Sequence, residues 1–173
     1  MAFTPTLAGQ KLTACALNDI ALCGVTTFRA YCNTAQSIAS RTTENVADAV
    51  IWDTIDLDLF GSWSSGTGTR WTCPKAGWWT FSGSVGFAGS SAGTLREAIW
   101  FQNGSLLGAG RGVSVVSTTI ATTALTAEAR TLTLLCAAGD YIELIPLQNT
   151  GSALPLATSS LRSYMTATYA GPN

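Results

Sequence analysis

The strongest alternation of apolar and polar positions runs through residues 70–87, RWTCPKAGWWTFSGSVGF. Pro74 to Gly77 has the composition of a turn, because proline fixes φ and has no N–H for a sheet ladder. After this turn every second residue is apolar or small, which predicts a strand with one face in a core. We expect it to be a central strand, and its core face comprises Trp79, Phe81, Gly83, Val85 and Phe87.

Shorter runs of the same period follow one another along the rest of the chain. Residues 95–102 are predicted to form a strand and not a helix, because Asn103-Gly104 follows at once and is the strongest short hairpin signal. About eight to ten short strands at near-regular spacing indicate an all-β sandwich or barrel. The predicted strands span 46–53, 56–63, 70–73, 78–87, 95–102, 105–113, 125–136, 141–147 and 161–169.

Residues 1–45 have a different pattern, with a Pro- and Gly-containing lead-in, a possible short helix over 13–22, a strand over 25–32 and a polar segment over 33–45. This region is either a docking arm or an extra helix and strand folded on the domain. We adopt the arm, which divides the chain into an arm, 1–45, and a β domain, 46–173. The predicted attachment residues of the arm are Phe3, Leu7, Leu12, Leu17 and Ile20.

Charged residues are scarce, at 11% of the chain against about 25% in an ordinary domain. The protein is therefore either a monomer with an uncharged polar surface or an oligomer that buries part of its surface. Interface cores are depleted in charged residues, which favours the oligomer. A net charge of −1 without a basic run argues against nucleic-acid binding. The chain has neither a signal-peptide pattern nor a bilayer-length apolar run, so we expect a soluble protein made in the cytoplasm.

The residues that usually carry out catalysis are missing or scattered. There is no histidine and no Gly-x-Ser-x-Gly motif, and a Ser–Lys pair would have to use Lys11 or Lys75. The five cysteines, at 15, 23, 32, 73 and 136, match no metal-binding spacing. They are expected to be buried thiols, with pairing among the first three as an alternative. We predict a non-enzymatic protein without a cofactor.

Two groups of side chains could form binding sites. Asp53, Asp56 and Asp58 could supply oxygen ligands to Ca²⁺, or simply face water. Trp63, Trp78 and Trp100 could be sugar-stacking platforms, or could fill the sandwich core or the trimer axis. The loops expected to meet a receptor are residues 64–69, 88–94 and 148–156.

The order of the motifs over about residues 46–171 resembles the jelly roll of the tumour-necrosis-factor and complement globular-head superfamily. Three segments carry the resemblance: the Pro-x-x-Gly-aromatic run from Trp71 to Phe81, the alternating leucines followed by Gly139-Asp140, and the closing strand around Tyr164. The resemblance implies a jelly-roll β-sandwich that forms a homotrimer. The residues expected to pack the core or the trimer are Trp71, Trp79, Phe81, Phe87, Tyr141, Tyr164 and Tyr169.

The opening MAFTPTLAGQKLTA, with Leu17-Asn18 after it, is similar to the start of virion proteins from tailed phages of actinobacteria. This implies a trimeric jelly roll on a virus particle, made in the host cytoplasm, whose partners are other virion proteins and a host cell-surface glycan. A minor tail or receptor-binding subunit is the leading interpretation. A capsid decoration protein and a secreted lectin-like module are the alternatives, and the sequence leaves tail or capsid location open.

Overall fold

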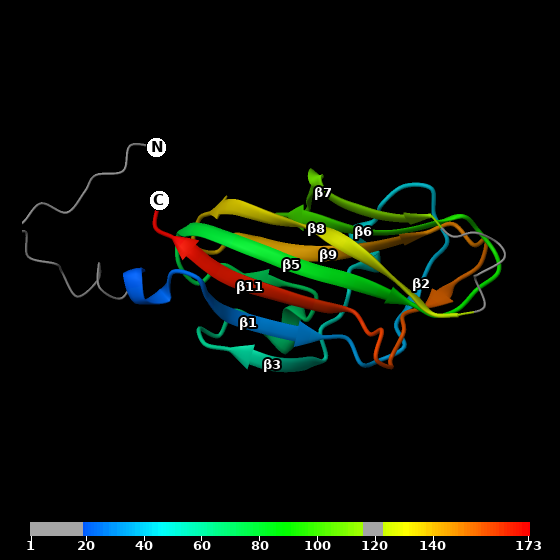
Figure 1. Cartoon of the computed structure of the whole chain (residues 1–173), viewed down its shortest axis with the longest axis horizontal. Helices are drawn as coiled ribbons and strands as arrows, with labels where there is room; N and C mark the ends of the chain where they lie inside the picture. Colours follow the sequence, from blue (N-terminus) through cyan, green and yellow to red (C-terminus); the bar gives the residue numbers. More distant parts are fainter. Residues whose placement is uncertain (1–18, 116–122) are drawn as a thin grey trace, which may run out of the picture.

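Figure 1 shows a computed structural model of the chain, which describes residues 19–115 and 123–173. The strands form two antiparallel sheets packed face to face, one in the order β3-β1-β11-β5-β8 and the other β4-β9-β6-β7, with a small β10-β2 pair at one end. The predicted all-β jelly-roll sandwich is confirmed. The strands are β1 Val25–Tyr31, β2 Ser37–Ile38, β3 Thr54–Asp58, β4 Trp71–Thr72, β5 Gly77–Phe87, β6 Leu95–Gln102, β7 Ser105–Val115, β8 Leu125–Cys136, β9 Tyr141–Gln148, β10 Leu154–Pro155 and β11 Tyr164–Gly171.

Strand β5 is an interior strand of the five-stranded sheet, as its alternation predicts. It pairs with β11 on one side and with β8 on the other. Its apolar set faces the second sheet, and Trp79, Phe81, Val85 and Phe87 have no exposed surface. The polar set, Trp78, Thr80 and Ser82, is only half-buried and lies on the outer face of the sheet.

The β6–β7 hairpin turns at Asn103-Gly104, as expected. Both residues have positive φ, 51° and 73°, which is what a two-residue type I′ turn requires. Residues 95–102 are therefore a strand in spite of their helix-forming composition. The register of the hairpin pairs Gln102 with Ser105 and Phe101 with Leu106.

Aromatic rings form a continuous chain through the core between the sheets. Trp71 contacts Trp79 and Phe81 edge-on, with centroid distances of 4.9 and 5.0 Å. Trp79 in turn meets Tyr169 at 5.0 Å, and Phe81 lies 6.1 Å from Trp100. Edge-to-face pairs at these distances add stability beyond their buried area. The indole N–H of Trp100 donates to the carbonyl of Arg130 at 2.9 Å, so this residue is a core residue and not a sugar platform.

The strand predicted for residues 25–32 belongs to the five-stranded sheet. β1 lies between β3 and β11, with Val25 opposite Tyr169 and Ala30 opposite Met165. A domain boundary at residue 45 would therefore divide the sandwich, because β1 is hydrogen-bonded to β11, the last strand of the same sheet. Before it, residues 19–22 form one helical turn.

The strand predicted for residues 46–53 is wrong. Val46–Asp48 is a turn of 3-10 helix, capped by the Asn45 side chain, which accepts a hydrogen bond from the Ala47 N–H at 2.9 Å. The apolar residues that suggested a strand do point inward, since Ala49, Val50 and Trp52 are buried. Strand β3 covers only part of the predicted 56–63 run, because Asp58 ends it by binding the following loop.

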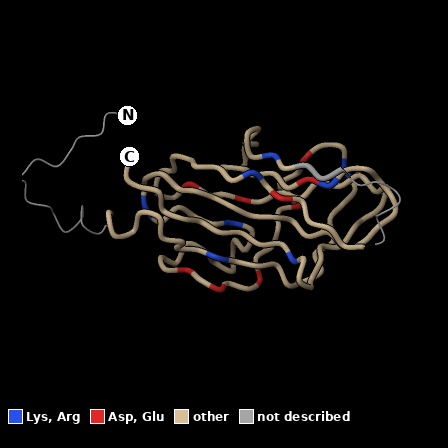
Figure 2. The backbone as a smooth tube through the Cα atoms, viewed as in Figure 1, with Lys and Arg blue, Asp and Glu red and all other residues tan. Residues whose placement is uncertain are grey.

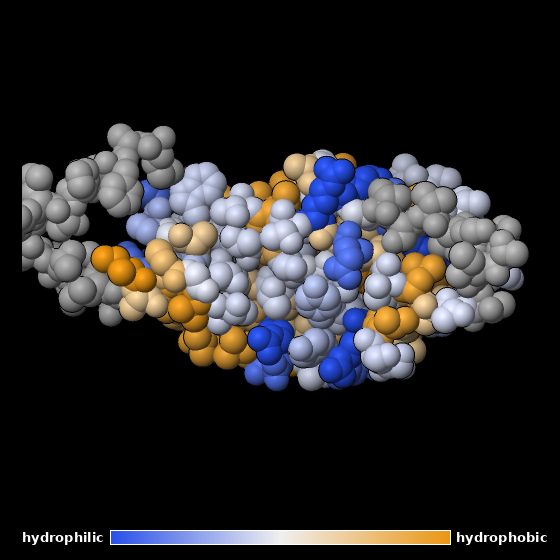
Figure 3. Space-filling view, viewed as in Figure 1, coloured by the Kyte–Doolittle hydropathy of each residue, from blue (hydrophilic) through white to orange (hydrophobic). Residues whose placement is uncertain are grey.

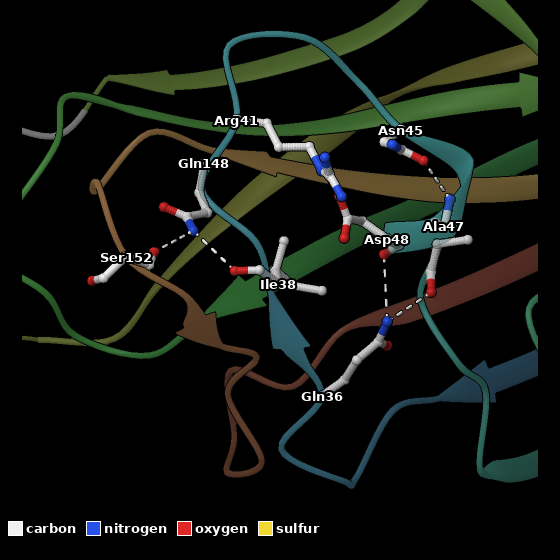
Figure 4. A network of polar contacts seen from close by, with 9 residues as sticks. Gln36, Ile38, Arg41, Asn45, Ala47, Asp48, Gln148 and Ser152 are labelled. Carbon is white, nitrogen blue, oxygen red and sulfur yellow. Dashed lines mark hydrogen bonds and ion pairs between the residues drawn. The ribbon is translucent and has the colours of Figure 1, made fainter.

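Residues 36–52, which we call the strap, follow the β9 edge of the four-stranded sheet (Figure 4). Arg41 N–H donates to the Gln148 carbonyl at 2.8 Å, and Val50 N–H donates to the Leu144 carbonyl at 3.0 Å. The Gln36 amide donates to the Ala49 carbonyl at 2.8 Å and holds the strap closed on itself. The polar segment predicted over residues 33–45 is thus a loop that is hydrogen-bonded to β9.

Candidate assembly surface

The two sheets differ in what covers their outer faces. Over the four-stranded sheet, Ala49 of the strap packs with Ile99, Phe101, Ile145 and Leu147, all nearly inaccessible to solvent. This second apolar cluster lies outside the sandwich core. The strap therefore covers the β9 and β6 part of this face, whereas Leu106 of β7, opposite Phe101 in register, is 44% exposed.

Ion pairs add to the cover of this face, which we call the closed face. The Arg111 guanidinium on β7 binds Glu44 of the strap and Glu97 of β6. The buried Glu143 accepts hydrogen bonds from Thr69 Oγ1 at 2.7 Å and from Arg70 Nε at 3.2 Å. Burial raises the pKa of Glu97, so the arginine beside it is needed to keep a charged carboxylate there.

The outer face of the five-stranded sheet has no such cover, and we call it the open face. Its residues lie on four neighbouring strands, and most carry hydroxyl groups. The hydroxyls are paired: Thr26 with Thr168 at 3.1 Å, Thr80 with Thr133 at 2.9 Å, and Thr166 with the Ser82 carbonyl at 3.4 Å. The open face comprises Thr26, Trp78, Thr80, Ser82, Thr133, Leu135, Tyr164, Thr166 and Thr168.

Charged residues are absent from β11 and β5 at the centre of the open face and occur on the strands beside them. Figure 2 shows β5 and β11 without a charged residue, and in Figure 3 the surface over them is mostly pale, neither strongly hydrophilic nor hydrophobic. Arg29 of β1, opposite Thr166 of β11 in register, forms an exposed ion pair at 3.0 Å with Asp56 of the edge strand β3. Arg162 lies over the Tyr31 ring at 4.4 Å. A neutral centre with aromatic residues is typical of interface cores.

The sandwich has two distinct ends. At one end Gly24 N–H donates to the Tyr169 carbonyl, which places the first described residues beside the C-terminus. Exposed apolar side chains belong to this end: Ile20 and Val25 flank Gly24, and Leu59, followed by Phe60, donates its N–H to the Thr27 carbonyl near the start of β1. Orange, hydrophobic patches are visible at the lower left of Figure 3. At the other end of β5, roughly 35 Å away for an eleven-residue strand, Ala88 N–H donates to the Pro155 carbonyl.

Two of the three loops expected to meet a receptor come together at this far end. The Asn149 side chain accepts hydrogen bonds from the N–H groups of Thr94 and Leu95, both at 2.8 Å. Residues 88–94 and 148–156 therefore form one tip. Residues 64–69 lie apart from it, since the carbonyls of Gly68 and Thr69 accept hydrogen bonds from the indoles of Trp63 and Trp52.

The predicted packing residues divide between core and surface. Trp71, Trp79, Phe81, Phe87 and Tyr169 are core residues, so Tyr169 is not available to another subunit. Tyr141 starts β9 and stacks under Arg70 at 4.0 Å, away from the open face. Tyr164 alone of the three tyrosines lies on the open face. The sequence signal for this face lies in the alternate positions of β5 and β11 that point away from the core. Many of these positions carry hydroxyl side chains.

The arm residues Phe3, Leu7, Leu12 and Leu17 lie outside the described residues. Ile20 is described, and 62% of its surface is exposed. It lies at the end of the sandwich that carries the other exposed apolar side chains.

The three aspartates proposed as Ca²⁺ ligands each have a different partner. Asp53 accepts hydrogen bonds from the N–H groups of Asn33 at 2.9 Å and Thr34 at 2.7 Å. Asp56 pairs with Arg29, and Asp58 accepts from the N–H of Ser62 at 2.9 Å. Within residues 19–115 and 123–173, no group of three acidic, cysteine or histidine residues could hold a metal ion.

The lysine available to a serine nucleophile is engaged elsewhere. Lys75 pairs with Asp19 and lies 5.6 Å from the Tyr169 ring centre. Lys11 lies outside the described residues. Among the helices that the structure describes, none has the length and apolar character needed to cross a membrane.

Asp140 fastens the two turns next to β9. Its carboxylate accepts hydrogen bonds from Asn103 Nδ2 at 2.9 Å, from the Ala137 N–H at 2.8 Å and from Gln102 Nε2 at 3.3 Å. These bonds, led by that from Asn103, hold the pKa of Asp140 below its ordinary value. The charged form is therefore favoured in the folded state.

A pH dependence of stability follows from this lowered pKa. The contribution of Asp140 is present above the unfolded-state pKa of about 3.9, and is lost as pH falls through the lower folded-state pKa. We expect Asp140→Asn to lower the free energy of unfolding at neutral pH, and to differ less from wild type at a pH below about 3. Urea unfolding at both pH values measures this gap, with Asp56→Asn as the surface control. A gap of the same size at both pH values would contradict the assignment.

Comparisons with known proteins support the fold. No family model matches the chain, and no curated protein matches it in sequence. The globular domain of the zebrafish complement 1qA protein superposes with a TM-score of 0.59 at 13% identity, covering 84% of this chain and 98% of that domain. Murine APRIL gives 0.56 at 12% identity, over 83% and 98% of the two chains, at pH 5.0 and again at pH 8.0.

The chain has a tumour-necrosis-factor-like jelly roll. The similarity of the sequence motifs to the tumour-necrosis-factor and complement globular-head superfamily is thereby supported as a similarity of fold. At these identities the likeness reports how the strands are arranged.

Proposed function

We propose that the chain is a non-enzymatic structural protein of a tailed-phage virion, in which three copies associate through the open face and project as a minor tail or receptor-binding subunit. The observation that carries the assembly is the contrast between the two sheets. One outer face is mostly covered by the strap and its ion pairs, whereas the other has two uncharged strands, β11 and β5, at its centre and includes Trp78, Leu135 and Tyr164. The number of copies rests on the fold resemblance.

The two ends of the sandwich support a projecting arrangement. The first described residues and the C-terminus lie at the end with exposed apolar side chains, which suits attachment to a larger body. The tip formed by residues 88–94 and 148–156 lies at the opposite end, where a receptor could reach it. Rigid β scaffolds commonly present binding residues on such loops.

The virion part of the proposal rests on the similarity of the opening residues to phage virion proteins. Its test is cryo-electron microscopy of particles from the phage that encodes the chain, compared with particles assembled without it. We expect three-fold density at the tail tip that disappears in the deficient particles, together with loss of adsorption to host cells.

Other outcomes separate the alternatives. Density at the three-fold positions of the capsid, with normal adsorption but lower heat resistance in the deficient particles, would make the chain a decoration protein. Absence of the chain from every particle would overturn the virion role. Assembly through the open face is tested separately, by the mass of the protein in solution.

A further inference from the structure

Two cysteines that are distant in sequence meet at the end of the sandwich where the first described residues and the C-terminus lie. Cys73 follows β4, and Cys136 is the last residue of β8, opposite Gly77 at the start of β5. Their side chains belong to the same buried cluster, and each thiol is the leading influence on the pKa of the other. The Cys73 thiol donates to the Lys75 carbonyl at 3.0 Å. Both are core residues, 2% and 1% exposed, and both are free thiols in the structure.

The backbone around the two thiols is fixed by hydrogen bonds. Cys73 N–H donates to the Asp140 carbonyl at 2.7 Å, and Gly139 N–H donates back to the Cys73 carbonyl at 2.9 Å. The Trp79 indole donates to the Lys75 carbonyl at 3.0 Å and so holds the turn that follows Cys73. The turn after β4 is thus fastened to the turn after β8, which holds the two cysteines close to each other in the core.

We propose that Cys73 and Cys136 are a disulfide-forming site that links the β4–β5 turn to the end of β8 once the protein meets a small-molecule disulfide. The link rests on the placement of two buried cysteines on turns that are hydrogen-bonded to each other, and it does not depend on the proposed virion role. Thiols persist in the reducing cytoplasm and disulfides persist in oxidising surroundings, so the link forms where the protein meets an oxidising environment.

The reaction is a double thiol–disulfide exchange. The Cys73 thiolate attacks one sulfur of the oxidant R–S–S–R, whose S–S bond breaks, so that Cys73–S–S–R forms and RS⁻ leaves with the proton that Cys73 has lost. Cys136 then gives up its proton and attacks the Cys73 sulfur, and a second RSH departs. The two cysteines lose two electrons and two protons, and the oxidant gains both.

The influence of each thiol on the other sets the order of these steps. It lowers the pKa of Cys73 and raises the pKa of Cys136. Cys73 is therefore the first to ionise, and the thiolate is the form that attacks. Because both sulfurs are buried, we expect oxidation to be slow when the protein is fully folded and faster a few degrees below its melting temperature.

The test uses the full chain with Cys15→Ser and Cys23→Ser, which removes two thiols outside the buried pair. It is incubated with oxidised glutathione, and reduced samples with dithiothreitol serve as reference. We expect a peptide cross-linked between Cys73 and Cys136 under non-reducing conditions. We also expect the melting temperature to rise by about 5–15 °C, as for a disulfide that closes a long loop, and to fall back on reduction.

Matched variants make the outcome specific. Cys136→Ala should abolish the oxidant-dependent rise, whereas Cys32→Ala, which removes another buried thiol, should keep it. Three results would overturn the proposal: glutathione attached to Cys73 without a cross-link, no cross-link just below the melting temperature, or a cross-link that lowers the melting temperature.

Discussion

Thr168→Arg is expected to convert the assembled protein into folded monomers. Thr168 lies on β11, in the middle of the open face, with its hydroxyl 3.1 Å from that of Thr26 and with Thr80 opposite it in register. An arginine there would place an unpaired charge at the centre of each interface. Charge repulsion of this kind costs several kcal/mol, so we expect association to weaken by at least about 100-fold.

Size-exclusion chromatography with light scattering measures the change, and circular dichroism checks the fold. Thr43→Arg is the matched control, because it introduces the same charge at an exposed position of the strap on the closed side. The control should elute with wild type. If Thr168→Arg eluted with wild type as well, while its spectrum stayed native, the open face would not be the interface.

Trp79→Ala is expected to cause a large loss of stability. The indole is fully buried, touches Trp71 and Tyr169 at centroid distances of 4.9 and 5.0 Å, and donates to the Lys75 carbonyl. Truncation leaves a cavity and removes the indole hydrogen bond to the Lys75 carbonyl, which then keeps only the weaker bond from the Cys73 thiol at 3.0 Å. We expect the free energy of unfolding to fall by about 3–5 kcal/mol, out of the roughly 5–15 kcal/mol usual for a domain.

The loss is best measured by urea unfolding in the Thr168→Arg background, where dissociation of subunits does not contribute. Trp78→Ala is the control, since the neighbouring tryptophan is only half-buried on the open face. We expect it to cost less than half as much. Equal losses for the two variants would mean that the assignment of faces along β5 is wrong.

The parts of the fold that local pattern determines were predictable from the sequence. The alternation from Trp79 to Phe87 placed the core face of β5 correctly, because side chains on a strand point to opposite faces in turn. Asn103-Gly104 placed the β6–β7 turn, because few residues other than Asn and Gly adopt positive φ without strain.

The strap was not predictable in the same way. Residues 33–45 have no apolar period, and their fold depends on partners far away in the sequence, as when Arg41 binds the carbonyl of Gln148. No local signal in a polar segment reports such a partner. The same separation in sequence explains why no local pattern predicts that Cys73 lies close to Cys136.

The candidate surface was half predictable. The low content of charged residues indicated a buried interface. Tyr164 and Tyr169 are an odd number of residues apart and therefore point to opposite faces of β11. Both were nevertheless expected to pack the core or the trimer. Which face of a strand turns toward the second sheet depends on the whole sandwich. Only the structure shows that Tyr169 fills the core beside Trp79 while Tyr164 faces outward.

The most direct measurement is the mass of the full wild-type chain by sedimentation equilibrium at micromolar concentration under reducing conditions. Assembly through the open face predicts a single species with three times the 18.0 kDa mass of one chain. A mass of 18.0 kDa at every concentration would contradict it, because the open face would then be an ordinary solvated surface.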